Sequence, residues 1–194
     1  MAKEESALRV IVVLVLIAFI SAFLLAYVNK VTSGPIEENK KAETKKAIGI
    51  VLSGLKDYTC PENPVEAKID NSPVKYFPAR TTDSSIVGYA IVVKGPNGFS
   101  GDFDLMVGLN AQGTIIDTYV LDHKETPGLG DGMKKEGFRK QFQGRNLDNT
   151  KWSVKKDGGD IDAITAATIT SRAFTRGVYR ALLLFRKLKE DSNA

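Results

Sequence analysis

The first feature along the chain is an uninterrupted run of apolar residues close to the N-terminus. Residues 10–28 carry no charge and are rich in valine, leucine, isoleucine and phenylalanine. A helix of this length can cross the hydrocarbon layer of a membrane, and the run is apolar on every side rather than along one stripe. A removed secretory signal is the main alternative, but no convincing small-residue cleavage site follows the run. The run therefore predicts a retained single-pass anchor, although the flanking charges do not decide which side the domain occupies.

Beyond the anchor, the pattern changes to a helix with one apolar side. Pro35 suits the first turn of a new helix. Apolar residues then recur on one stripe: Ile48, Val51, Leu52 and Leu55. These patterns divide the chain into a tail and anchor at 1–30, a connecting amphipathic helix at 31–57 and a folded domain at 58–194.

The middle of the chain has the composition and spacing of a β-sheet. Runs with the composition of β-strands lie at 86–94, 103–109 and 114–121. The last two are joined by a hairpin turn at 110–113, and the glycine-rich stretch at 95–101 is interpreted as a hairpin loop. Residues 58–78 contain four prolines and predict an irregular connection with one short strand near 74–77.

The C-terminal part of the chain has mainly helical spacing. Met133, Phe138 and Phe142 fit a short helix, 152–154 fits a strand, and a long amphipathic helix is predicted at 169–190. The apolar face of that helix repeats every three or four residues: Phe174, Val178, Ala181, Phe185 and Leu188. The expected fold class is α+β, with one transmembrane helix followed by an antiparallel sheet packed by helices.

Composition removes several kinds of chemistry. Cys60 is the only cysteine and His123 the only histidine. The chain therefore cannot form an internal disulfide, and we expect neither a cysteine-bound iron–sulfur cluster nor a transition-metal site. The net charge is +4, but basic and acidic residues are mixed over most of the chain, so we expect no nucleic-acid partner.

A hydroxyl-rich decapeptide, DAITAATITS at 162–171, lies where the chain enters the final helix. Free N–H groups and the positive end of the helix dipole favour an anion at such a place. Ala166 and Ala167 are small enough for a ligand to approach the backbone. The simpler alternative is a helix N-cap made by Thr165 or Thr168.

A second short segment, HKETPGLG at 123–130, follows the third predicted strand. Pro127 and Gly128 suit the two central positions of a type II turn, so an ordinary loop at the end of a strand accounts for these residues on their own. His123 is interpreted as structural or exposed, and no catalytic residue is assigned to this segment.

Together the two segments resemble the FMN-binding domain family. DAITAATITS is similar to the family's attachment signature, in which the last threonine is esterified to the flavin phosphate. By position, Asp162, Thr165, Ala166 and Ala167 match the frame, and Thr168 becomes the covalent FMN attachment site. The family usually has glycine where this chain has Ala166. No His or Cys stands nearby in the sequence to activate the hydroxyl, so a separate flavin transferase is implied.

The resemblance also implies where the flavin is contacted. The family carries a similar H-x-ETPGLG stretch lining the flavin. Glu125 and Thr126 are thereby expected near polar atoms of the ribityl chain or ring, and Gly128 and Leu129 near the isoalloxazine. Ser171 adds a hydroxyl donor to the group of cofactor-binding residues.

The order and spacing of anchor, sheet and both motifs resemble the G subunit family of Rnf complexes. Such complexes couple electron transfer between ferredoxin and NAD to export of Na⁺ or H⁺. The resemblance implies a flavoprotein that relays electrons without turnover of its own, in contact with integral-membrane and redox subunits and with membrane lipid. Its domain is expected on the extracytoplasmic side of the cell membrane.

Three other functions remain open from the sequence. The first is the C subunit of the sodium-translocating NADH:quinone oxidoreductase, which is usually longer. The second is an anchored binding or scaffold module without a cofactor. The third is a freestanding flavin enzyme, for which no general base or polar substrate cluster is recognisable.

Overall fold

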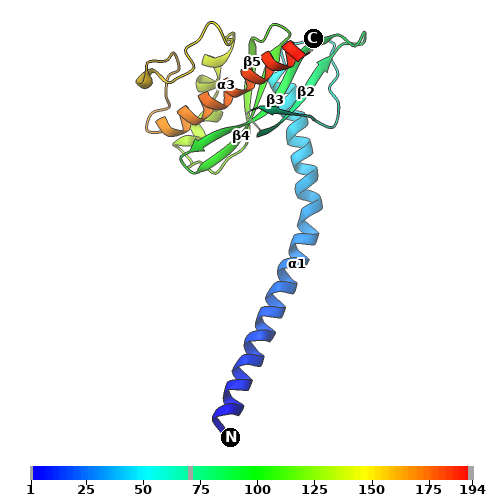
Figure 1. Cartoon of the computed structure of the whole chain (residues 1–194), viewed down its shortest axis with the longest axis vertical. Helices are drawn as coiled ribbons and strands as arrows, with labels where there is room; N and C mark the ends of the chain where they lie inside the picture. The colour runs from blue at the N-terminus through cyan, green and yellow to red at the C-terminus, as the bar shows by residue number, and fades with distance from the viewer. Residues whose placement is uncertain (1, 70–71, 192–194) are drawn as a thin grey trace. The chain divides into compact units, whose positions relative to one another are not determined.

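The computed structural model describes residues 2–69 and 72–191, which form a long N-terminal helix and an α+β unit (Figure 1). The chain separates into two compact units with the boundary between Glu43 and Thr44. The predicted fold class is confirmed: one long apolar helix precedes an antiparallel sheet that is packed by helices.

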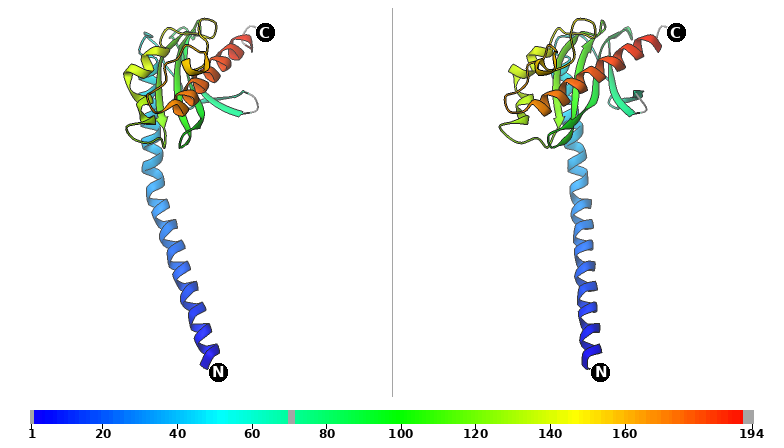
Figure 2. Two further views of the ribbon diagram at one scale, coloured as in Figure 1. Left: turned by 90° about the vertical axis from the view of Figure 1, so that its left-hand side faces the viewer. Right: turned by 60° about the vertical axis from the view of Figure 1, so that its left-hand side comes forward.

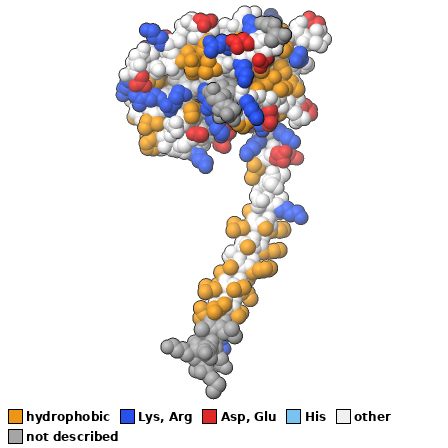
Figure 3. All heavy atoms as spheres, viewed as in Figure 1, with side chains coloured by type: hydrophobic (Ala, Val, Ile, Leu, Met, Phe, Trp, Pro, Cys, Tyr) orange, Lys and Arg blue, Asp and Glu red, His pale blue; other side chains and the backbone are white. Residues whose placement is uncertain are grey.

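Helix α1 runs from Ala2 to Val51 as one continuous element. Every large apolar side chain described between Val10 and Val28 is at least half exposed, and Figure 3 shows such side chains along the visible face of this part of the helix. Because water does not favour so much exposed apolar surface, this stretch suits a membrane, and its length and composition are sufficient to cross one. These features describe a membrane-anchored protein.

The prediction that a separate helix begins near Pro35 is wrong, because Pro35 lies inside α1. A proline in a helix lacks the N–H that would bond to the carbonyl four residues earlier, here that of Val31. Residues around Pro35 are exposed, so this carbonyl can bond to solvent instead. The helix also passes through residue 30, where the anchor is predicted to end, without a break.

The sheet has five strands in the order β1-β2-β3-β4-β5, and every neighbouring pair is antiparallel. The strands are β1 (Val65–Ile69), β2 (Ser72–Arg80), β3 (Ile86–Gly98), β4 (Gly101–Asn110) and β5 (Ile115–Asp122). The predicted meander is confirmed for the last three strands. The glycine-rich stretch forms the tip of the β3–β4 hairpin, where Gly98 pairs with Gly101.

The irregular connection predicted for residues 58–78 is wrong over much of its length, because β1 and most of β2 occupy it. The prolines of β2 are tolerated by their position. Arg80 donates its backbone N–H to the Thr59 carbonyl. The backbone nitrogen of Pro78, two residues earlier, faces the same side of β2, where the pairing with β1 stops at Tyr76. Pro73 faces the other side, and pairing of β2 with β3 begins only at Lys75. Neither proline therefore removes a ladder hydrogen bond.

Helices cover both faces of the sheet. Helix α3 (Thr168–Asp191) lies across one face, as the two views of Figure 2 show, and packs on alternate residues of β3 and β4 such as Ile91 and Leu105. The last two turns of α1 belong to the same unit and pack on the opposite face, against Phe77, Ala90 and Met106. The period of two along the strands thus supplies an apolar surface to each layer.

Short helical pieces connect β5 to α3. They are η1 (Gly130–Lys134), α2 (Glu136–Arg139), η2 (Lys140–Phe142) and η3 (Lys155–Asp157). The predicted helix around Phe138 is therefore present as consecutive short turns. The strand predicted at 152–154 is wrong, because only an isolated bridge joins Val154 to Ile161. The Trp152 side chain bonds to the Asn146 carbonyl and holds this region as a packed loop.

Candidate functional site

The site is built around the first turn of α3. The helix begins at Thr168, and the carbonyl of Ala167, directly before it, accepts the backbone N–H of Ser171 at 3.0 Å. Within the described residues, the backbone N–H groups of Thr168, Ile169 and Thr170 have no hydrogen-bond partner. These groups and the helix dipole form a positive end that favours an anion.

The turn before the helix is left-handed at Ala166, whose φ is +60°. An L-residue with a Cβ is strained in this region, whereas a glycine would adopt it without strain. Ala166 is also exposed, so its backbone is open to a ligand. The turn places Thr165 on one side of Ala166 and the start of α3 on the other.

The hydroxyl groups of the decapeptide have different neighbours. The Ser171 hydroxyl is fully buried, accepts the Ile164 N–H at 2.9 Å and donates to the Ala167 carbonyl at 2.9 Å. Over the described chain, the hydroxyls of Thr165 and Thr168 form no hydrogen bond, so neither threonine acts as the N-cap considered from the sequence. Ser171 stabilises the turn, and the Thr168 hydroxyl stays available at the start of the helix.

The HKETPGLG segment adopts the turn that its sequence predicts. Leu129 donates its N–H to the Thr126 carbonyl at 3.2 Å, with Pro127 and Gly128 between them. Gly128 has a φ of +78°, as the third residue of a type II turn requires. Thr126, Gly128 and Leu129 are all exposed, so this turn presents open backbone and one apolar side chain.

Glu125 joins the two motifs. Its Oε2 accepts a hydrogen bond from the Thr170 hydroxyl at 3.0 Å, and its Oε1 accepts one from the backbone N–H of Ser100 at 3.3 Å. The segment before η1, the start of α3 and the tip of the β3–β4 hairpin therefore meet at one carboxylate. A Cβ added at Gly98 would lie 2.5 Å from Oε1, and one added at Gly130 would overlap Oε2.

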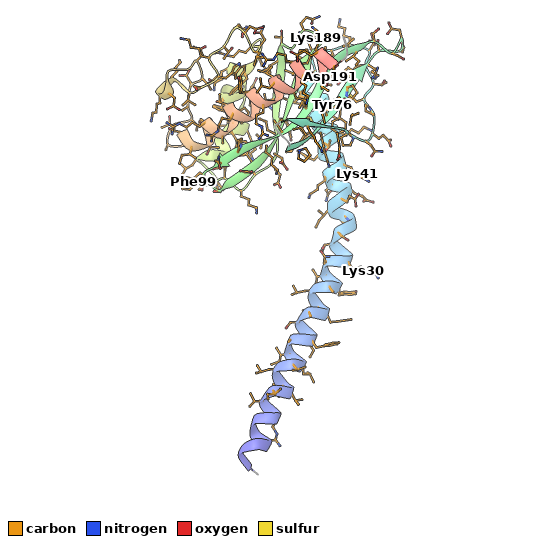
Figure 4. All side chains as sticks on the ribbon, in the orientation of Figure 1. Lys30, Lys41, Tyr76, Phe99, Lys189 and Asp191 are labelled. Atoms are coloured by element: carbon orange, nitrogen blue, oxygen red, sulfur yellow. The ribbon has the colours of Figure 1, made fainter. Side chains whose placement is uncertain are left out.

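The hairpin tip contributes a feature that the sequence did not reveal. Phe99, next to Ser100, is 70% exposed and points outward (Figure 4). Leu129 and Ile169 are 44% and 46% exposed. Each of these apolar side chains neighbours one of the three segments that meet at Glu125. Large exposed apolar groups gathered around one polar site are typical of a binding surface.

Charged pairs hold the loops beside the start of α3. Arg172 donates to both carboxylate oxygens of Asp157, at 2.7 and 2.8 Å. These hydrogen bonds lower the pKa of Asp157. Lys155 pairs with Asp162 at 2.8 Å, and the Asp162 backbone bonds to the side chain of Gln141. The first residue of the decapeptide is thus fixed from two sides.

Other candidate centres do not coincide with these motifs. Two surface clefts of about 310 and 510 Å³ are lined by other residues, among them Leu147 and Arg186. His123 Nδ1 is buried and has no hydrogen-bond partner in the described structure. Among the described residues, no group of three or more His, Cys, Asp or Glu side chains is arranged to hold a metal ion.

The chemical groups around the start of α3 suit the parts of a flavin nucleotide. Unpartnered N–H groups and the Thr168 hydroxyl suit a phosphate, while the open turn at 126–129 and the neighbouring apolar side chains suit an aromatic ring. Residues 98–183 match the family model of the FMN-binding domain. The protein is therefore a flavoprotein that binds FMN.

Relatives that match almost the full chain narrow the class. The chain is 31% identical over 198 residues to the G subunit of the ion-translocating oxidoreductase complex from Shewanella piezotolerans, covering 96% of this chain and 93% of that one. It is 32% identical over 202 residues to the G subunit of the corresponding complex from Pseudomonas aeruginosa, covering 97% and 93%. The chain belongs to the G subunit family of ion-translocating oxidoreductase complexes, as its two motifs predict.

A solved structure supports the fold. The crystal structure of NqrC from Shewanella oneidensis matches with a TM-score of 0.50 and 21% identity, covering 69% of this chain and 72% of that chain. At this identity the likeness concerns the arrangement of the strands and helices alone.

Proposed function

We propose that this chain is the electron-carrying flavin subunit of an Rnf-type complex, with FMN joined to Thr168 through a phosphoester. The complex would couple electron transfer between ferredoxin and NAD to export of Na⁺ or H⁺. The observation that carries the proposal is the start of α3, where an unbonded threonine hydroxyl lies among unpartnered backbone N–H groups. Membership of the G subunit family and the FMN-binding match support the same role.

The choice of Thr168 among the hydroxyls rests on availability and charge. Thr170 and Ser171 already bond within the protein and are buried. Thr165 lies before the helix, whereas Thr168 is its first residue. A phosphodiester on Thr168 keeps one negative charge at the positive end of the helix, where such a charge is stabilised.

Attachment to Thr168 requires an activated flavin donor and an enzyme. We take the donor to be a flavin dinucleotide. The Thr168 O–H bond and one P–O bond of the pyrophosphate break, a bond forms between Thr168 Oγ and the FMN phosphorus, and a nucleoside monophosphate leaves. The proton goes to a base of the transferase, because a threonine hydroxyl is a weak nucleophile without one.

The remaining predicted contacts fall into two groups around Thr168. Thr165, Ala166 and Ala167 offer backbone beside the phosphate, and Thr126, Gly128 and Leu129 form the open turn that would face the ribityl chain and ring. Bound FMN supplies reversible electron transfer, and the protein supplies its position and surroundings. The chain needs no catalytic residue of its own in this role.

The test of the Thr168 attachment uses the full-length chain produced together with a flavin transferase. Intact mass should increase by one FMN less one water, and the band on a denaturing gel should fluoresce. Thr168→Val should remove both signals. Thr175→Val is the matched control, since it makes the same exchange elsewhere in α3, at a hydroxyl that bonds to the Ser171 carbonyl, and it should keep both. A fluorescent band in the Thr168→Val protein, or an unmodified wild-type chain, would refute the assignment.

Membrane placement is tested separately. We propose that the globular unit lies outside the cytoplasm, attached by α1 to the membrane and to integral-membrane subunits. Protease added to intact spheroplasts should then digest the unit from residue 44 onward. Protection of that unit until the membrane is lysed would reverse the orientation.

A further inference from the structure

Glu125 is an acidic side chain buried to 5% exposure at the centre of the site. Both of its carboxylate oxygens accept hydrogen bonds from the protein, one from the Thr170 hydroxyl and one from the Ser100 N–H. Burial of a carboxylate is costly unless such donors are present. Glu125 therefore uses both of its carboxylate oxygens in hydrogen bonds to the protein itself.

Thr170 approaches Glu125 from a defined side of α3. Successive residues of a helix are about 100° apart, so Thr168 and Thr170 point to nearly opposite sides, about 160° apart. Thr170 is 1% exposed and faces Glu125, while Thr168 is partly exposed and faces away from that contact. The hydrogen bond to Glu125 therefore fixes the rotation of the helical turn that presents Thr168.

We infer that Glu125 is a positioning residue for flavin attachment, acting through Thr170 to orient Thr168, and is not itself a flavin ligand. This inference rests on the proposed attachment at Thr168. Through Ser100 the same carboxylate sets the distance of the hairpin tip from α3. Gly98 and Gly130 allow the close approach, because a Cβ at either position would collide with the carboxylate.

Thr170→Val tests the role of the hydrogen bond while keeping the size of the side chain. The measured quantity is the rate at which transferase and a flavin dinucleotide modify the purified full-length chain in detergent. The rate should fall by roughly 10- to 100-fold, because a displacement of the reacting group by about 1 Å has effects of this order. Thr170→Ser retains the hydroxyl and should restore the wild-type rate.

Thr175→Val is the matched control for a loss of stability. Thr175 is also a buried threonine of α3, and its hydroxyl donates to the Ser171 carbonyl at 2.8 Å without contacting Glu125. This variant should lose some thermal stability and yet accept flavin at the wild-type rate. A role of Glu125 in stability alone predicts instead that attachment follows the fraction of folded protein in every variant.

Glu125→Asp provides an independent variant should Thr170→Val fold poorly. It keeps the charge but withdraws the carboxylate by one methylene, and it should slow attachment as Thr170→Val does. In the completed product, flavin fluorescence polarisation should fall for Glu125→Asp and Thr170→Val and stay unchanged for Thr175→Val. Wild-type rates for both Glu125→Asp and Thr170→Val would overturn the inference, as would equal slowing by Thr175→Val. Absence of flavin on the wild-type chain would instead overturn the proposed function.

Discussion

The left-handed backbone at Ala166 makes a quantitative prediction about the turn before α3. Its φ of +60° costs an alanine about 1–2 kcal/mol relative to a glycine in the same conformation. Glycine gains conformational freedom in the unfolded chain, which offsets roughly 0.4–1 kcal/mol of that relief. Because Ala166 is exposed, its methyl group contributes little packing. Ala166→Gly should therefore stabilise the globular unit by about 0.5–1 kcal/mol.

The matched control is Ala163→Gly, in the same loop. Ala163 does not have a positive φ, so a glycine there relieves no strain. It only raises the conformational entropy of the unfolded chain, and it should destabilise the unit by about 0.4–1 kcal/mol. The difference between the two variants, about 1–2 kcal/mol, is the cost of the left-handed conformation.

Urea unfolding of the full-length chain in detergent measures this difference. Trp152 is the only tryptophan and is half-buried in the globular unit, stacked on Phe142. Its fluorescence therefore reports unfolding of that unit and not of the apolar stretch at 10–28. In thermal unfolding, each kcal/mol should correspond to about 2–4 °C for a unit of this size. If Ala166→Gly and Ala163→Gly lower stability equally, Ala166 does not adopt the left-handed conformation.

Two further predictions concern packing and charge. Gly108→Ala should destabilise the globular unit by about 3 kcal/mol or more, because the added Cβ would overlap the Val51 carbonyl oxygen. Gly137→Ala in α2 has open space around it and should stabilise the unit by about 0.5 kcal/mol. Urea midpoints measure both changes. Arg172 lowers the pKa of Asp157, so that pair stabilises the fold above the unfolded pKa of about 3.9 and its contribution is lost as pH falls through the folded pKa. Asp157→Asn should lower the urea midpoint at pH 7, and the difference from wild type should shrink below about pH 4; a constant difference would contradict this reasoning.

Local patterns predicted the elements that have a continuous apolar run or a regular spacing of apolar residues. The apolar run of α1, the meander from β3 to β5 and the amphipathic α3 follow from spacing, and all three are present. Two wrong predictions concern prolines, and they have a related cause. Pro35 continues a helix because its exposed surroundings tolerate one unpaired carbonyl, and Pro78 sits in a strand because its missing N–H faces no partner strand. Both outcomes depend on what lies beside the proline in space.

The two motifs lie side by side in the fold, but their sequences do not predict how they meet. Glu125 and Thr170 are 45 residues apart, and Glu125 and Ser100 are 25 apart, so no local pattern links them. In the sequence, Phe99 is only one residue of the glycine-rich stretch at 95–101. The glycines around Phe99 were the one sequence signal of a close contact at this hairpin tip, since Gly98 leaves room for the Glu125 carboxylate. Closeness of this kind depends on the fold.

The four hydroxyls of the decapeptide have different hydrogen-bond partners, and this difference bears on the proposed attachment. Two of them are bound inward: Thr170 to Glu125 across the unit, and Ser171 to the turn itself. These contacts fix the first turn of α3 without using Thr168 or its N–H group. Thr165 and Thr168 remain outside that network, and of these only Thr168 belongs to the helix whose dipole would stabilise a phosphate. Hydroxyls that look interchangeable in the sequence therefore have different surroundings. Under the proposed attachment, exchanging Thr170 should alter the rate of attachment and exchanging Thr168 should abolish it.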